Sequence, residues 1–437
     1  MIASDRIDLK KICIMILIIY AYIASLLEAV FNSLFLHIAI ILLVLFIMFI
    51  SETITKNKFL FFKTDLLFIL SIIGIIASLH STEFRTKEIA VPIVYIMILI
   101  ITYFVRTEVK NYKSSANLIK WFSIVIALSV IFSYIFPSLY ERLFLSTLIS
   151  GYADNIKELM AQGYYTGFTS QVAYSAGYII NGIGLMFCIW LVNKNTKNKG
   201  LNVILFFLLV FALLLTQKRA HLLFTFISIV IVYLQFSTHY IEKFKKSINL
   251  IIIGVISSLV IIPLLLLTSV GETLFFRLSM TIQNLSLDQD ISSGRLDLWH
   301  LAWQLFLNNP LLGVGWGNFS SHVVGTVTVE TEMQTHNIYL QILSETGIFS
   351  ALVIFLPMFI TYIKTFKFAR IISLKQNSFS IEAKIGILYS LFCQTFFLLY
   401  GLTGNPIYDF SYFSIYLISV GLFYSILSKN INQKERY

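Results

Sequence analysis

Residues 172–192 read VAYSAGYIINGIGLMFCIWLV, a run of 21 residues without a charged side chain. A helix needs roughly 20 apolar residues to cross the hydrocarbon core of a bilayer, so this run predicts a transmembrane helix. Comparable runs, some with ragged ends, occur at 12–30, 34–51, 65–79, 88–105, 118–136, 201–216, 220–237, 248–270, 337–363, 385–403 and 410–428. The sequence therefore predicts an all-α polytopic membrane protein with about twelve transmembrane helices.

Composition supports the same fold class. Hydrophobic residues make up 58% of the 437 residues and charged residues 12%, about half the charged share expected of a soluble domain. Cys13, Cys188 and Cys393 all fall inside apolar runs, far apart in sequence, so they are expected to pack as small hydrophobic residues. A water-soluble globular protein is excluded.

The net charge of +10 comes from 32 Lys and Arg residues against 22 Asp and Glu. Most of these cations lie in alternate connections between the apolar runs, which is the positive-inside pattern of membrane proteins. The pattern predicts a multi-pass membrane protein with both termini in the cytoplasm. The basic clusters are explained by contact with anionic membrane lipid, so no nucleic-acid partner is expected.

Two connections on the opposite, extracytoplasmic side are long, at 137–171 and 271–336. Long connections in compact proteins are often functional. We expect the loop 271–336, between helices 9 and 10, to contain a helix over 296–307 that ends at Asn308-Asn309-Pro310. The predicted organisation is an N-terminal part, 1–170, with transmembrane helices 1–5 and the first long outer loop, followed by a catalytic membrane core, 171–437.

The first candidate for chemistry is the short outer link that contains Gln217, Lys218 and Arg219. Ionisable residues near the membrane are costly and point to function. The planar guanidinium of Arg219 suits a phosphate because it can donate two hydrogen bonds to adjacent oxygens. A Lys-Arg pair that reaches from a helix end to the membrane surface is the structural alternative.

The second candidate is Ser293-Gly294-Arg295 at the start of the predicted loop helix. Free backbone N–H groups at a helix N-terminus, beside a cation, form a reasonable phosphate site. Ser293 can instead serve only as the N-cap of this helix.

Three further groups lie in the same loop or directly after it. Gly313-Val314-Gly315-Trp316-Gly317-Asn318-Phe319 has three alternating glycines, which indicates a sharply turning backbone, and we favour a structural role for it over a dinucleotide site. His336-Asn337 precedes a predicted helix that contains Glu345, and the imidazole of His336 can accept a proton near neutral pH. Asp288 and Asp290 have the spacing of a weak Mg²⁺ site.

These residues share one side of the membrane, where ATP and nucleotide sugars are absent. A transferase on that side needs an activated donor held in the lipid, such as a polyprenyl-diphosphate-linked glycan. Two cations for the diphosphate and a base for an acceptor hydroxyl are a sufficient minimal set.

In order and spacing, these motifs resemble the O-antigen ligase and O-antigen polymerase superfamily of membrane glycosyltransferases. The resemblance rests on 215–220, 293–299, 309–319 and 336–347, and extends more loosely to 167–176. It implies the lipid-dependent, GT-C-like glycosyltransferase fold and a metal-independent, inverting transfer from undecaprenyl diphosphate. The family often has Ser where this chain has Lys218, and the segment near Gln171 lacks a frequent Asn, so acceptor contacts are not assigned.

Carried over by position, Arg219 and Arg295 hold the diphosphate and His336 acts on the acceptor. We expect substrate contacts from a wider set of neighbours, namely Lys218, Gln217, Ser293, Gly315, Gly317, Asn318, Asn337 and Glu345. The implied partners are an undecaprenyl-diphosphate-linked oligosaccharide, membrane lipid and a protein that regulates chain length.

Within the family, the intact glycine run and the Ser-Gly-Arg motif favour a polymerase of lipid-linked repeat units. A ligase that transfers polymer to a lipid A core sugar is the alternative. A transporter or flippase is a third interpretation, but the chain shows no internal repeat and almost no charge at the centres of its apolar runs.

Overall fold

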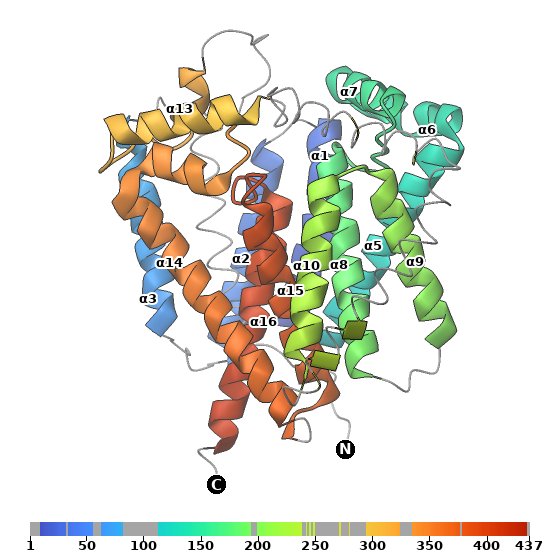
Figure 1. The fold of residues 1–437 in the computed structure, drawn as a ribbon, viewed down its shortest axis with the longest axis vertical. Helices are drawn as coiled ribbons and strands as arrows, with labels where there is room; N and C mark the ends of the chain where they lie inside the picture. The colour runs from blue at the N-terminus through green and yellow to red at the C-terminus, as the bar shows by residue number, and fades with distance from the viewer. Residues whose placement is uncertain are drawn as a thin grey trace.

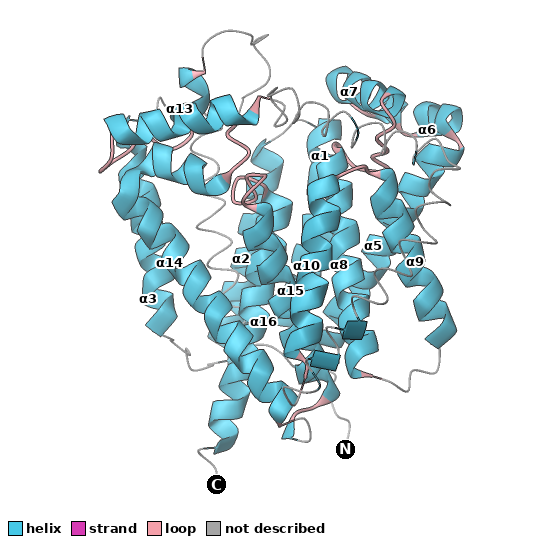
Figure 2. Cartoon of the chain, in the orientation of Figure 1, coloured by secondary structure: helices cyan, strands magenta, loops and turns pink. Residues whose placement is uncertain are grey.

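The structure, a computed structural model, describes residues 9–31, 34–55, 63–81, 112–193, 199–237, 294–323, 334–375 and 378–434, with isolated positions between 242 and 279. In this described part Figure 2 shows helices and loops and no strand. The longer helices are α1 (Leu9–Phe31), α2 (Leu34–Thr55), α3 (Lys63–Ala77), α5 (Tyr112–Ile135), α8 (Val172–Val192), α9 (Lys199–Leu215), α10 (Arg219–Gln235), α14 (Ile338–Leu374), α15 (Ile381–Tyr400) and α16 (Phe410–Lys434).

Each predicted apolar run that the structure describes forms one of these helices. Among the described residues, six helices are long and apolar enough to cross a membrane, and four shorter apolar helices, in α2, α3, α9 and α10, accompany them. The all-α, multi-pass membrane fold is therefore confirmed. The runs at 88–105 and 248–270 lie outside the described residues, so the count of twelve stays a prediction.

Shorter helices cover one end of the bundle (Figure 1), which we call the capped end. They are α6 (Pro137–Leu143), α7 (Ser150–Ala161) and α13 (Arg295–Asn308), with the 3₁₀ turns η1 (Ser78–Ser81), η2 (Leu145–Thr147) and η3 (Asn318–His322). Pro137 opens α6 at a position where its missing N–H costs no hydrogen bond. The cover predicted for 137–171 is thus present as two helices that pack on α1 and α5 through buried Tyr140 and Ile156.

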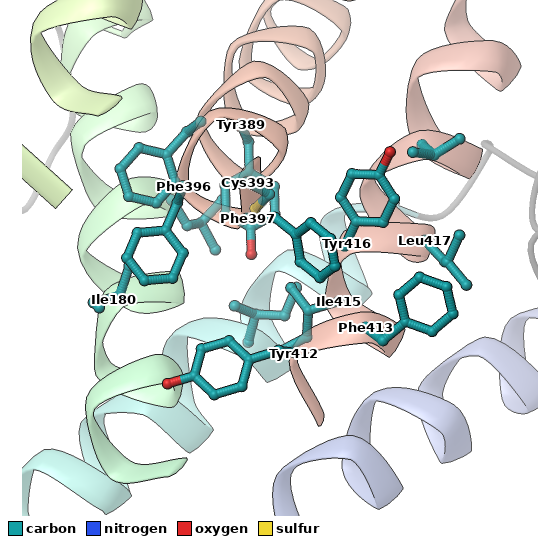
Figure 3. Close-up of a cluster of buried hydrophobic side chains, with 14 of the residues drawn as sticks. Ile180, Tyr389, Cys393, Phe396, Phe397, Tyr412, Phe413, Ile415, Tyr416 and Leu417 are labelled. Carbon is teal, nitrogen blue, oxygen red and sulfur yellow. The ribbon is translucent and has the colours of Figure 1, made fainter. Parts of the chain in front are cut away.

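The core of the bundle lies between α8, α15 and α16 and is dominated by aromatic rings (Figure 3). Phe397 stacks on Tyr416 with ring centroids 4.2 Å apart, and Cys393 is buried beside them. Cys13 and Cys188 are buried as well and none of the three is paired, as the sequence predicts. Such aromatic pairs add about 0.5–1.5 kcal/mol beyond the burial of their area.

Helices from both halves of the sequence pack against each other. The helix α3 runs along α14, and α1 packs on both α5 and α16. The N-terminal helices therefore share one bundle with the C-terminal helices, and the proposed boundary at residue 170 stays a prediction.

Candidate active site

A kink in α14 shapes the capped end. At Gly347 the backbone leaves the helical conformation, with φ 71° and ψ 178°, so residues 338–346 form a separate helical segment. The kink leaves the carbonyl groups of Ser344 and Glu345 without helical partners, and the N–H groups of Val314 and Gly315 donate to them at 3.0 and 2.8 Å. A Cβ on Gly347 would lie 2.3 Å from the Leu311 carbonyl oxygen, so glycine is required here for close packing as well as for its φ.

The glycine-rich loop is held to this segment by one carboxylate. Glu345 is fully buried, and its Oε2 accepts hydrogen bonds from the Gly317 N–H at 2.9 Å and from the Tyr408 hydroxyl. Its Oε1 accepts from the Gln341 side-chain amide at 2.6 Å and from the Phe319 N–H at 3.3 Å. With four donors already in place, this carboxylate joins the loop, α14 and the α15–α16 turn.

Other residues of the glycine-rich loop also pack against the protein. Trp316 is fully buried and stacks on Tyr408, with ring centroids 5.0 Å apart, and the backbone N–H of Trp316 donates to the Ser78 carbonyl at 3.0 Å. The side-chain amide of Asn318 donates to the Val314 carbonyl at 3.0 Å. For Gly315, Gly317, Asn318 and Glu345 we therefore favour structural roles over the predicted substrate contacts.

His336 lies at the entrance to α14 in a strained backbone conformation, with φ 52°. Its neighbours hold this conformation. The Thr335 N–H donates to the Gln341 side-chain oxygen at 2.8 Å, and the Asn337 side chain accepts from the N–H groups of Tyr339 and Leu340 as the N-cap of α14. Asn337 is thus occupied in capping, whereas the His336 side chain remains exposed.

Arg295 is the first residue of α13 and is tied to the same region. The N-cap is Gly294, in the left-handed conformation with φ 80°, and Ser293 lies outside the described residues, as do Asp288 and Asp290. The indole N–H of Trp299, one turn further along α13, donates to the Thr335 carbonyl at 2.9 Å. This hydrogen bond joins the helix that begins at Arg295 to the residue that precedes His336.

The link between α9 and α10 contributes the third part of the site. Gln217 also has a positive φ, 53°, and in the described part of the chain Gln217 and His336 are the only residues other than glycine with this conformation. Its side chain is 4% exposed, and neither its amide nitrogen nor its amide oxygen has a hydrogen-bond partner. Strained backbone and unpaired buried polar groups both concentrate at functional sites.

Electrostatic interactions link residues of these three segments. Burial and then the positive charge of Arg295 lower the pKa of Lys218, which is half-buried at the N-cap of α10. Loss of surrounding water, followed by the charges of Arg295 and Lys218, lowers the pKa of His336 below its usual 6.5, although part of the ring stays exposed. The arrangement is two cations beside an imidazole that is neutral at pH 7, which fits an anionic ligand and an acceptor of a proton.

Arg219 follows Lys218 as the first residue of α10, and its side chain is exposed. The predicted role of Arg219 in holding a diphosphate stays a prediction, whereas the charge of Lys218 acts on His336.

The α15–α16 turn adds a group that the sequence did not single out. Burial raises the pKa of Asp409 to about 7, against hydrogen bonds from the N–H groups of Tyr412 and Ser411 that lower it. The charges of both Asp409 and Arg295 act on Tyr400, so this carboxylate borders the cationic cluster. The sequence did offer one sign of this group, because Asp409 is an acidic residue in the short connection between the last two apolar runs.

No group of three or more His, Cys, Asp or Glu able to hold a metal ion occurs among the described residues. This observation does not test metal dependence, because the Asp288 and Asp290 pair is not described. Metal independence stays a prediction.

Comparison with known proteins supports the resemblance found in the sequence. Residues 204–355 match the family described as O-antigen ligase, a range that contains the α9–α10 link, α13 and the first part of α14. The chain is 25% identical over 268 residues to a "ComP-specific O-oligosaccharyltransferase" of Acinetobacter baylyi. This alignment covers 58% of the present chain and 43% of that relative, so the chain matches less than half the length of the relative.

Proposed function

Because residues 204–355 match the family described as O-antigen ligase, we propose that this chain transfers a glycan from a lipid-linked diphosphate donor to a sugar hydroxyl. The observation that carries the proposal is the electrostatic interaction among Lys218, Arg295 and His336, which come from three segments far apart in sequence. They belong to the α9–α10 link, the start of α13 and the chain just before α14. The named activity of the relative, transfer of an oligosaccharide, belongs to the same class of reaction.

In the proposed mechanism, Arg295 and Lys218 bind the diphosphate and stabilise the negative charge that it gains as it leaves. The acceptor oxygen attacks the anomeric carbon from the face opposite the diphosphate. The bond between that carbon and the phosphate oxygen breaks with its electron pair, and the acceptor proton moves to His336. The configuration at the anomeric carbon is therefore inverted.

Gln217 fits this scheme as a further ligand contact. A buried amide without partners costs roughly 1–3 kcal/mol per unpaired group, and hydrogen bonds to a bound substrate would offset that cost. Its position directly before Lys218 places the backbone of both residues at the same link.

For the specific reaction, we propose polymerisation of lipid-linked repeat units of an O-antigen, capsule or exopolysaccharide, with undecaprenyl diphosphate as the lipid. The site then lies on the outer face of the cytoplasmic membrane, with both termini in the cytoplasm and a chain-length regulator as an additional partner. Ligation of finished polymer to lipid A core is supported equally by the family match and stays the second candidate.

Deletion of the gene separates the two reactions. Loss of a polymerase leaves single repeat units on the cell surface, whereas loss of a ligase leaves long polymer attached to the carrier lipid. Complementation with Lys218→Met, Arg295→Gln and His336→Asn tests the site. We expect each variant to fail, while Lys375→Met, an exposed lysine at the opposite end of α14, restores polymer fully.

Equal amounts of inserted protein must be verified for each variant. Full polymer output from all three site variants would contradict the proposed site and would favour the transporter interpretation.

A further inference from the structure

The helix α13 has three distinct faces. Its inner face packs against the bundle through buried Ala302 and Leu305, with Leu340 of α14 among their neighbours. A narrow polar face contains exposed His300 and Gln304. A helix that lay simply on a protein surface in water would need only an inner apolar face and an outer polar one.

The third face is apolar and exposed. Leu296 is 45% exposed, Trp303 47% and Leu307 57%. At about 100° per residue these three side chains fall within roughly 40° of one another on the helix. The centre of the stripe points about 180° away from Leu305 and about 60° away from the midpoint between His300 and Gln304. The stripe therefore faces away from the protein core and borders the polar face, with His300 about 20° from Leu307.

Further exposed apolar side chains follow α13 and lie on α14. After α13 ends, Leu311 and Leu312 are 57% and 55% exposed, and this segment hydrogen-bonds to α14 at its kink through the Pro310 carbonyl. On α14 just beyond the kink, Phe349 and Leu352 are 63% and 58% exposed on a helix long and apolar enough to span a membrane. Figure 1 shows α13 across the end of α14 at the margin of the bundle.

We propose that α13 is inserted sideways into the outer leaflet of the bilayer, with the stripe of Leu296, Trp303 and Leu307 in contact with lipid. The occupant of this face is the lipid that already surrounds α14, because α13 packs against α14 and both helices expose apolar side chains, as does the segment of Leu311 and Leu312 between them. A tryptophan beside leucines, with a polar face turned to water, is typical of helices that lie in the membrane interface.

This insertion has a consequence for the site. Arg295 is the first residue of α13 and immediately precedes Leu296, so the depth of the helix sets the depth of the guanidinium. A helix held at the level of the lipid headgroups presents Arg295 where the diphosphate of a lipid donor lies. This consequence rests on the proposed function, whereas the insertion itself does not.

The test is the depth of individual positions in the full-length protein, reconstituted into vesicles of phosphatidylcholine and phosphatidylglycerol. Single cysteines at Trp303 and Leu307 on the stripe, and at Gln304 and His300 on the polar face, would carry a nitroxide label. The three native cysteines are buried, and the unsubstituted protein measures any background labelling. Electron paramagnetic resonance then compares access by oxygen, which enters lipid, with access by a water-soluble nickel chelate.

We expect the ratio of oxygen to nickel access at Trp303→Cys and Leu307→Cys to exceed the ratio at Gln304→Cys several-fold. Equal ratios on the two faces would overturn the proposal, because the stripe would then face water. Protection of the stripe from both reagents would also overturn it and would indicate a protein cover, such as a second copy of this chain. Quenching of tryptophan fluorescence by brominated lipid is the independent check without a label, and it should be smaller in Trp303→Phe, in which the exposed Trp121 and Trp190 of α5 and α8 remain.

Discussion

Replacement of Glu345 by glutamine tests how the capped end is held together. The substitution keeps the size of the side chain and replaces one carboxylate oxygen with an NH₂ group. In the structure each oxygen accepts two donors, and one of them in each pair is a backbone N–H, of Gly317 or of Phe319. Whichever way the new amide is oriented, one backbone N–H therefore faces another donor.

The expected cost follows from these contacts. The better orientation places the new NH₂ towards Tyr408, whose hydroxyl can turn and accept, so that only the Gly317 N–H loses its acceptor. A buried donor left without a partner costs about 1–3 kcal/mol. The donors that remain also bind a neutral oxygen, and hydrogen bonds to charged groups are roughly twice as strong as neutral ones. Together these effects destabilise the attachment of the loop by about 2–4 kcal/mol.

Hydrogen–deuterium exchange measures this loss locally. A change of about 2 kcal/mol accelerates exchange through local opening roughly 30-fold, so the amides of 313–319 should exchange at least that much faster in Glu345→Gln. The matched control is Glu141→Gln, the same chemical change at an exposed position of α6, for which we expect no difference in this loop.

Unchanged exchange of 313–319 in Glu345→Gln would refute the reasoning. The loop would then be held by its backbone contacts with α14 alone, and Glu345 would again be a candidate for substrate binding. Faster exchange spread evenly over the whole protein would also contradict a local role.

The remaining predictions concern packing and protonation. Gly313→Ala should destabilise the protein by several kcal/mol in thermal unfolding, because Gly313 has a φ of 68° and the added Cβ would lie 2.3 Å from the backbone of α14. Gly200→Ala is the control and should be neutral or stabilising, because a Cβ at this helical position would lie in open space. Trp316→Ala should lower stability by about 3–5 kcal/mol in the same measurement, since a fully buried ring is removed. In ¹³C-histidine NMR, His336 should titrate below pH 6.5, and Arg295→Gln should raise that pKa because one positive charge is removed; an unchanged pKa would show that the two side chains do not interact.

Much of the fold could be predicted from hydropathy alone. The run at 172–192 becomes α8 with the same bounds, because a span without charge has no alternative in a bilayer. The predicted loop helix over 296–307 is α13, Arg295–Asn308, and it ends where Asn309 and Pro310 follow. Local signals were sufficient for these elements.

The kink at Gly347 could not be predicted, because it depends on a distant segment. The carbonyl groups of Ser344 and Glu345 can leave the helix only where Val314 and Gly315 supply new donors. The hydropathy pattern predicts one long apolar helix there. No local feature of the sequence indicates the hydrogen bonds between the two segments.

The roles of the candidate site residues stay a prediction. The sequence assigned Arg219 and Arg295 to the diphosphate, whereas in the structure the charges of Arg295 and Lys218 act on His336. The structural role of Glu345 could not be inferred, because the sequence alone does not distinguish a carboxylate that binds substrate from one that accepts four hydrogen bonds within the protein. Asp409 was missed because its significance comes from burial next to Tyr400.

The central claim is transfer of a glycan from a lipid diphosphate at the site formed by Lys218, Arg295 and His336. The most direct measurement is the release of undecaprenyl diphosphate from lipid-linked repeat units by the purified protein in vesicles, in buffer with EDTA. We predict that longer glycan and free lipid diphosphate appear together with the unsubstituted protein, and that neither appears with His336→Asn. Equal release by His336→Asn, or no transfer with any lipid-linked donor and acceptor, would contradict the account.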